Sequence, residues 1–89
     1  MRPFRWNDWN IDHATKHGVS VAEAEAVVRA ARRPYPEDIG NGKWIVIGRG
    51  HSGRFVQVIY VLDNDGTVYV IHARVLDDQE KRRLRRRLR

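Results

Sequence analysis

The sequence contains no cysteine, which excludes disulfides, thiolate catalysis and cysteine-based metal sites. No apolar run approaches the roughly 20 residues that a membrane-spanning helix needs. The segment from Met1 to Arg5 lacks the apolar stretch of a secretory signal peptide. We therefore expect a cytoplasmic protein in a reducing environment, with no membrane partner.

The 89 residues are enough for one domain with a modest core, and not for two. Hydrophobic residues make up 42% of the chain, which allows a folded core, and charged residues make up 31%, which indicates a well-solvated surface. Internal repeats and linker-like stretches are also absent. The sequence therefore predicts a single domain over residues 1–89.

Positive charge is abundant but confined to one end of the chain. Residues 81–89 hold seven of the 17 lysines and arginines and none of the 11 acids, so the other residues carry a net charge of −1. A local run of one sign is typical of a segment that binds a polyanion, although a solvated helix end that only keeps the protein soluble is the simpler interpretation. We favour a nucleic-acid partner, RNA in particular.

Two helices are predicted in the first third of the chain. Residues 9–17 have helical spacing of apolar or small side chains and end at Gly18, which accepts the left-handed conformation that closes a helix. Ser20 and Glu23 match the S-x-x-E capping box, which predicts a second helix from Val21 to about Arg32. Two prolines that follow would end it.

Strand signals dominate the middle of the chain. Segments dense in β-branched and aromatic residues cover 43–49, 54–62 and 67–75, and residues 4–6 predict a short first strand. Asp63 to Gly66 form a strong hairpin signal. We expect a loop between the second helix and the first of these strands.

The last helix is predicted over residues 77–89, and the fold that follows is of the α+β class. A D-x-x-E capping box opens this helix, and Leu76, Leu84 and Leu88 form a thin apolar stripe that can dock on the sheet. The expected architecture is two N-terminal helices packed on an antiparallel three- to four-stranded sheet, followed by a C-terminal helix. The two helices cover one face, and the opposite face is largely open.

Residues 48–53 match the pattern G-x-G-x-x-G, which is found in dinucleotide-binding folds. That fingerprint requires a helix directly after the loop, whereas here a strand follows. We therefore interpret the segment as a flexible hairpin connection. A weaker functional interpretation remains, because Arg49, His51 and Arg54 surround backbone amides that suit a phosphate contact.

The four histidines are the side chains expected to titrate near neutrality. His13 and His17 are four residues apart, but the glutamate of H-E-x-x-H is missing between them, so a metal site is not predicted. His17 fits either catalysis or a favourable position at the C-terminal end of a helix dipole. His72 and Arg74 share one strand face about 7 Å apart, which fits either a base beside a fixed cation or a half-buried edge histidine.

Carboxylates are poorly placed for metal-dependent catalysis. Glu23 and Glu25 are expected on a helix surface, and no acidic cluster resembles that of a metal-dependent nuclease. Cleavage of RNA would then need no metal and no other cofactor. The 2′-hydroxyl would attack the adjacent phosphate, with arginines stabilising the developing charge and a histidine or lysine moving protons.

Several short motifs occur in an order that is specific when they are taken together. They are Phe4-x-Trp6, then Lys16 to Ser20 with Glu23 and Ala24, then Trp44-x-x-Ile47-Gly48-Arg49, then Arg54 and Val58-x-Tyr60, and finally Ile71-x-Ala73-Arg74 with Glu80. In these motifs the chain resembles the BrnT family of bacterial type II toxins, which are small ribonucleases with a RelE-like fold. Asn7, the segment from Pro34 to Gly42 and the arginine-rich tail depart from that family's pattern.

The resemblance implies a toxin of a type II toxin–antitoxin system, an endoribonuclease that inhibits translation and is held inactive by a DNA-binding antitoxin encoded beside it. The expected catalytic residues are Arg49, Arg74, His17 and His72. The expected RNA-binding residues are Lys16, Arg54, Lys81, Arg82 and Arg83.

A second hypothesis is a non-catalytic module that binds nucleic acid or a protein through the basic C-terminal helix. In a third hypothesis, the arginine-rich tail binds an acidic segment of the antitoxin, which covers it. A near-neutral body with one charged end is also compatible with a 2:2 toxin–antitoxin complex.

Overall fold

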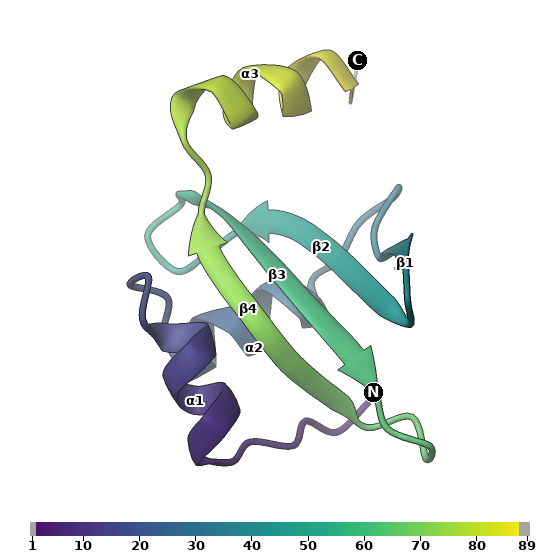
Figure 1. Cartoon of the computed structure of the whole chain (residues 1–89). Coiled ribbons are helices and arrows are strands. Elements are labelled where there is room, and N and C mark those ends of the chain that lie inside the picture. Colours follow the sequence, from purple (N-terminus) through teal and green to yellow (C-terminus); the bar gives the residue numbers. More distant parts are fainter. Residues whose placement is uncertain (1, 88–89) are drawn as a thin grey trace.

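The computed structural model describes residues 2–87, which fold as a four-stranded antiparallel sheet with helices before and after it (Figure 1). In chain order the elements are α1 (Asp8–Thr15), α2 (Val21–Arg29), β1 (Glu37–Gly40), β2 (Lys43–Arg49), β3 (Phe55–Leu62), β4 (Val68–Val75) and α3 (Asp78–Arg87). The strands lie side by side in sequence order, β1-β2-β3-β4. The predicted α+β architecture is therefore confirmed.

The two N-terminal helices begin at polar caps. Asn7 caps α1 through a reciprocal pair of hydrogen bonds with Asn10, which the sequence analysis did not foresee. Ser20 caps α2 and its Oγ accepts a hydrogen bond from the Glu23 amide, as predicted. The second half of the predicted capping box is wrong, because the Glu23 carboxylate turns toward Arg54 and away from Ser20.

Both helices are shorter than the sequence pattern suggests. The first ends at Thr15 and leaves His17 outside it, and the second ends at Arg29, three residues before the predicted end. Gly18 has a φ of +84°, in keeping with its predicted role after the first helix. Helix ends are the least sharply encoded boundaries, because terminal residues make fewer backbone hydrogen bonds.

Strand β1 is the main element that the sequence analysis missed. It pairs with the first part of β2 and includes Glu37 and Asp38, which were expected in a loop. Gly40, Asn41 and Gly42 all have positive φ, so an Asn-Gly turn closes this hairpin. The predicted strand at residues 4–6 is reduced to one parallel bridge between Phe4 and Val68.

The core lies between the sheet and the two N-terminal helices. Alternate β3 residues Val56, Val58 and Tyr60 are buried against them, and Gly48 of β2 faces Val27 of α2. The wider core is continuous and contains Ala14, Val19, Ala24, Val27, Tyr35, Val46, Val56, Val58, Tyr60, Val68, Val70, Ala73, Leu76 and Leu84. Residues at the intervening positions of β3 are only partly buried, so the opposite face is more open.

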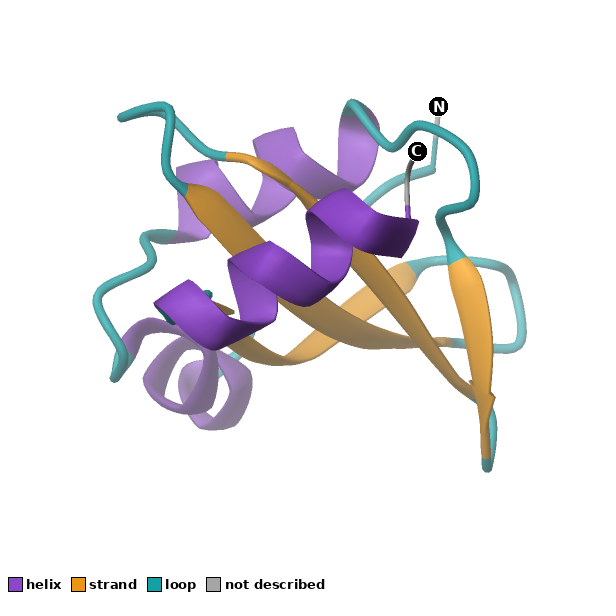
Figure 2. Ribbon diagram, turned by 90° about the horizontal axis from the view of Figure 1, so that it is seen from above, coloured by secondary structure: helices purple, strands orange, loops and turns teal. Residues whose placement is uncertain are grey.

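Helix α3 lies over the end of the sheet where β4 ends and β3 begins (Figures 1 and 2). Leu76 and Leu84 are buried there, so part of the predicted apolar stripe is confirmed, whereas Leu88 lies outside the described residues. The predicted D-x-x-E capping box is present, since the Glu80 amide donates to Asp77 and the Asp77 amide donates to Glu80. None of the helices within residues 2–87 is long and apolar enough to cross a membrane.

Candidate nucleic-acid interface

A basic cluster lies at the edge of the sheet, where the end of α1 meets β4. It comprises Lys16, His17, His72 and Arg74 and is called the β4-edge cluster below. The rings of His17 and His72 meet edge to face with 5.6 Å between their centroids. Gly18 turns the chain directly after His17, so the helix end places the two histidines together.

The electrostatics of the cluster favour an uncharged His72. Its pKa is lowered below 6.5, first by burial and then by repulsion from His17, Arg74 and Lys16. Both effects penalise the imidazolium form. At neutral pH, His72 is therefore a neutral imidazole that can accept a proton.

Arg74 is held by a carboxylate from α3. Its two terminal nitrogens donate to the two carboxylate oxygens of Glu80, in a bidentate pair. Glu80 also accepts a hydrogen bond from the Asp77 amide, and these contacts, with that from Arg74 first, lower its pKa to about 2. The guanidinium is therefore well oriented, but its charge is compensated.

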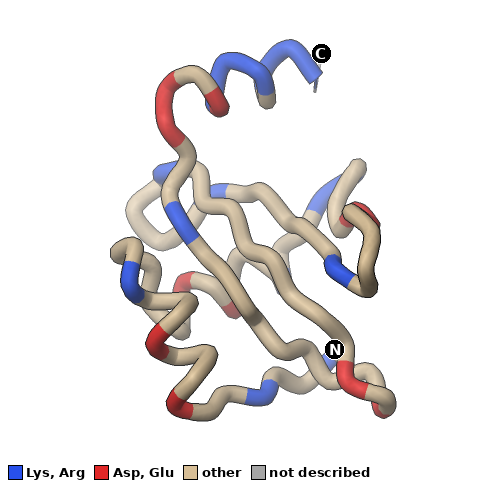
Figure 3. The backbone as a smooth tube through the Cα atoms, viewed as in Figure 1, with Lys and Arg blue, Asp and Glu red and all other residues tan. Residues whose placement is uncertain are grey.

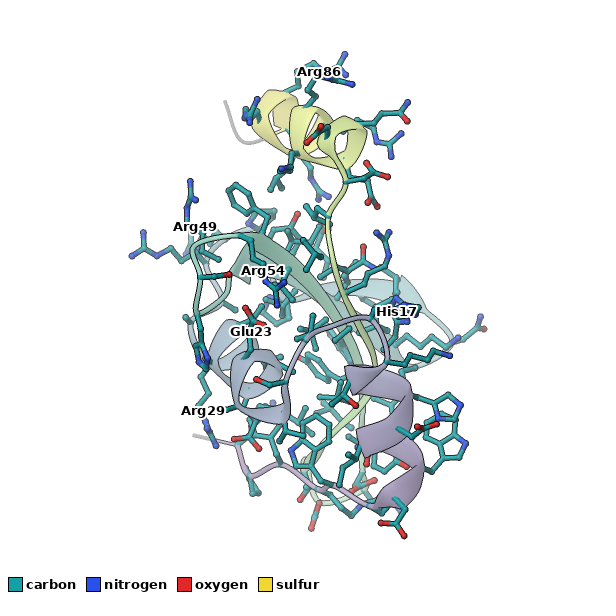
Figure 4. All side chains as sticks on the ribbon, turned by 90° about the vertical axis from the view of Figure 1, so that its left-hand side faces the viewer. His17, Glu23, Arg29, Arg49, Arg54 and Arg86 are labelled. Atoms are coloured by element: carbon teal, nitrogen blue, oxygen red, sulfur yellow. The ribbon has the colours of Figure 1, made fainter. Side chains whose placement is uncertain are left out.

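Arg54 belongs to a separate structural ion pair. It donates to Glu23 at 2.9 Å and to the carbonyl of Gly18 at 2.7 Å, and the side chains of Arg54 and Glu23 point toward one another (Figure 4). Glu23 is only 4% exposed, although a surface position was expected, and it also accepts the His51 amide. Its pKa is lowered mainly by Arg54. Arg54 therefore joins three segments of the fold and lies in this pair and not in the β4-edge cluster.

The glycine-rich loop is explained by the same ion pair. A Cβ atom at Gly50 would overlap the Glu23 carboxylate, so only glycine fits beside it. Gly53 has a φ of +78°, which glycine adopts without strain. The loop joins the antiparallel strands β2 and β3, so its interpretation as a hairpin connection is confirmed.

Arg49 differs from Arg54 and Arg74 in having no carboxylate partner among residues 2–87. Its guanidinium carbon lies 4.4 Å from the centroid of the Phe55 ring, and it donates one hydrogen bond to the Gly53 carbonyl. Arginine offers five N–H donors, so most of them remain available. The side chain is thus fixed in place with an uncompensated charge.

Two cavities share Tyr35 and Ile47 among their lining residues. The first, the α3 cavity, has a volume of about 320 Å³ and lies between α3 and the sheet, with Gln57 and Arg83 in its lining. The second, the edge cavity, has a volume of about 410 Å³. Its lining comprises Ala30, Arg32, Arg33, Tyr35, Ile47, Gly48, Arg49 and Phe55. Arginines are among the lining residues of both cavities.

The first turn of α3 is acidic and the rest of the helix is basic, as Figure 3 shows. Lys81 pairs with Asp78 at 3.2 Å, and Arg87 pairs with Glu37 of β1. Arg82 and Arg83 are exposed. The Lys81–Asp78 pair lies within the helix, whereas the Arg74–Glu80 and Arg87–Glu37 pairs link the two ends of α3 to the sheet and leave arginines between them exposed to solvent.

The structure thus brings together four of the predicted site residues, which form the β4-edge cluster. Arg49 lies in the edge cavity, Arg83 lines the α3 cavity, and Lys81 and Arg82 lie elsewhere on α3. Arg32 and Arg33 were not among the predicted site residues, although two adjacent arginines directly before a proline are a signal of local positive charge.

Within residues 2–87, no group of three or more histidine, aspartate or glutamate side chains is placed to hold a metal ion. Comparison with protein-family models, with curated proteins and with solved structures gave no match for the chain.

Proposed function

We propose that this protein is a metal-independent endoribonuclease, the toxin of a type II toxin–antitoxin system that inhibits translation in the cytoplasm. The observation that carries the proposal is the β4-edge cluster, in which a neutral histidine lies beside a second histidine, a lysine and an arginine. The ordered sequence motifs that resemble BrnT toxins support the same conclusion.

In the proposed reaction, His72 removes the proton from the 2′-hydroxyl of a bound ribonucleotide. The 2′-oxygen attacks the adjacent phosphorus, and the bond from phosphorus to the 5′-oxygen of the next nucleotide breaks. His17 or Lys16 donates a proton to this leaving oxygen. The products are a 2′,3′-cyclic phosphate and a free 5′-hydroxyl, so protons and bonds balance.

Arg74 would stabilise the extra negative charge on the phosphate oxygens during this step. Its pairing with Glu80 sets the direction of the guanidinium but also competes with the phosphate for it. Binding of RNA in the proposed mode therefore requires the phosphate to share or replace the carboxylate.

The test combines growth with cleavage by the purified protein. Induced expression should stop growth, and the purified chain should cleave RNA in the presence of EDTA, leaving cyclic phosphate ends. His72→Ala should reduce cleavage by about 10²- to 10⁴-fold, the usual contribution of one general base. His51→Ala is the matched control, because His51 is exposed and lies in the β2–β3 connection. Normal growth together with intact RNA would refute the proposal.

The inhibitor that the proposal requires is an antitoxin with an acidic segment and a DNA-binding domain, encoded beside this protein. Co-expression of an adjacent small reading frame should restore growth, and the two proteins should co-purify. Loss of co-purification at high salt would identify the basic helix α3 as part of the contact.

A second candidate function is a binding module without catalysis. The observation in its favour is that Arg54 and Arg74 are both paired with carboxylates, whereas unpaired arginines line the cavities and α3. This alternative predicts RNA that is bound with salt-dependent affinity and recovered intact after long incubation. Recovery of cyclic phosphate ends would rule it out.

A further inference from the structure

The edge cavity lies where the edge of β2 is uncovered. Strand β1 pairs only with Lys43 to Ile45, so from Val46 to Arg49 no strand within residues 2–87 borders β2 on that side. The chain between α2 and β1 passes this edge and contributes Arg32, Arg33 and Tyr35 to the cavity wall. The volume of about 410 Å³ is within the usual range for small-molecule sites, roughly 300–1,000 Å³.

The charged residues that line this cavity are all positive. Arg32, Arg33 and Arg49 line it, and no aspartate or glutamate is among its lining residues. None of the three pairs with a carboxylate within residues 2–87. Five other arginines do have such partners, namely Arg5, Arg29, Arg54, Arg74 and Arg87. Three arginines without a carboxylate partner in the described residues therefore line one cavity, which favours an anion with several oxygens, such as a phosphate.

The cavity also offers a flat aromatic surface beside the charge. Arg49 stacks on Phe55, and planar guanidinium and phenyl groups both support a nucleobase by stacking. Tyr35 adds an aromatic wall, and its hydroxyl group is buried without a hydrogen-bond partner in the described part of the chain. Burial raises the pKa of Tyr35, so the hydroxyl stays protonated.

We propose that the edge cavity is a nucleotide-binding subsite, in which Arg32, Arg33 and Arg49 bind a phosphate and the Arg49–Phe55 pair supports the attached base. This inference rests on the proposed function and names a part of the RNA path that is separate from the β4-edge cluster. The α3 cavity shares Tyr35 and Ile47 with the edge cavity and is also lined by Gln57. Gln57 lies between Arg74 of β4 and Ile47 of β2 in the strand register. Two interstrand spacings separate Arg74 from Ile47, roughly 10 Å, so one single strand can contact both sites.

Binding of three probes to the full chain tests the subsite: inorganic phosphate, a nucleoside 5′-monophosphate and a short single-stranded oligoribonucleotide with 2′-O-methyl groups, which cannot be cleaved. The affinity should rise from phosphate to mononucleotide to oligonucleotide. Equal affinity for phosphate and mononucleotide would show that the cavity does not bind the base. Absence of mononucleotide binding up to millimolar concentration would overturn the subsite altogether.

Single substitutions test whether the mononucleotide binds in the edge cavity. Arg33→Gln should weaken mononucleotide binding by about tenfold or more, the usual effect of losing a charge-assisted hydrogen bond. Phe55→Leu should weaken the mononucleotide about tenfold while leaving phosphate nearly unchanged. Lys43→Gln is the matched control, because it removes the same charge from an exposed position of β2 outside both cavities. A mononucleotide affinity that falls equally in Arg33→Gln and Lys43→Gln would contradict a localised site.

The outcomes also separate the subsite from the ribonuclease proposal. Localised mononucleotide binding by a protein that never cleaves RNA would support the subsite and refute the enzyme. Cleavage of RNA with unchanged KM in the Arg33→Gln variant would support the enzyme and refute the subsite. Arg33 is exposed and unpaired, so its loss should leave the thermal unfolding midpoint unchanged, which is the check on folding.

Discussion

At the scale of single residues, carboxylates decide which arginines are available to a ligand. Glu23 pairs with Arg54 and Glu80 pairs with Arg74, whereas the contacts of Arg49 within residues 2–87 are with a carbonyl and an aromatic ring. A sequence shows which arginines exist but not which of them have partners, because Glu23 and Arg54 are 31 residues apart. The pairing pattern therefore had to come from the structure.

His72 provides the first test at this scale. Its imidazole should titrate with a midpoint below 6.5 in the folded protein and near 6.5 in urea, as measured by NMR. Because the folded pKa is lowered, neutral His72 contributes stability fully above pH 6.5, and this is lost as the pH falls through the folded value. On the acidic side of the pH profile, the cleavage rate should fall as His72 becomes protonated, with the same pKa as that of the folded protein. A folded midpoint above 6.5 would contradict the environment described for this residue.

Gly50 provides a second test. In Gly50→Ala, the new methyl group must displace the Glu23 carboxylate from Arg54 and from the His51 amide. We expect the free energy of unfolding to fall by about 2 kcal/mol, within the range for overpacking of a tight site. Urea denaturation measures the change, with Ser52→Ala in the same loop as the control. A loss equal to that of the control would show that the carboxylate moves without cost.

At the scale of elements, α3 is attached by a small apolar contact and by ion pairs at its two ends. Leu84 is buried, Glu80 reaches Arg74 on β4, and Arg87 reaches Glu37 on β1. The D-x-x-E signal predicted the start of this helix because capping is a local interaction. The same local signal could not reveal that Glu80 also binds a residue on the adjacent strand.

The double role of Glu80 leads to a third test. Glu80→Gln keeps an acceptor for the Asp77 amide but removes the negative charge opposite Arg74, so stability at pH 7 should fall by about 2 kcal/mol. The pKa of Glu80 is about 2, and its ordinary value is 4.5. The advantage of the wild-type protein should therefore be complete above pH 4.5 and disappear as the pH falls toward 2. Denaturation curves of both proteins across this range measure the difference.

The same variant also tests function. With its carboxylate partner removed, Arg74 is free for phosphate, so RNA affinity should rise in Glu80→Gln. Gln79→Glu, which adds a charge on an exposed neighbouring position, is a useful comparison. An unchanged affinity in Glu80→Gln would indicate that Arg74 does not contact RNA.

At the scale of the whole molecule, positive charge lies along a path that the sequence only partly predicted. The local arginine run predicted basic charge on α3, and the strand patterns predicted most of the sheet. The edge cavity could not be predicted from the sequence, because β1 was not recognised and the uncovered part of β2 follows from its short pairing with β1. The β4-edge cluster was anticipated in part, since spacing placed His72 beside Arg74, but only the fold brings His17 to them.

The salt dependence of RNA binding tests this distribution of charge. Replacing Arg82, Arg83, Arg85 and Arg86 by glutamine, with Leu84 kept, should make the slope of log K against log salt shallower by up to about 0.7 per lost contact with a single strand. For the Arg33→Gln variant, this slope should change by no more than about 0.7, the value for one lost contact. An unchanged slope in the fourfold variant would show that α3 lies away from the bound strand.

The order of the strands has a consequence for the speed of folding. Every strand pairs with its neighbour in sequence, so each hairpin closes a short loop and the sheet can grow one strand at a time. Local pairing of this kind loses little loop-closure entropy, which favours early formation of the sheet. The contacts of α1 with β4 and the parallel bridge between Phe4 and Val68 join segments far apart in the sequence, so we expect the N-terminal segment to pack last.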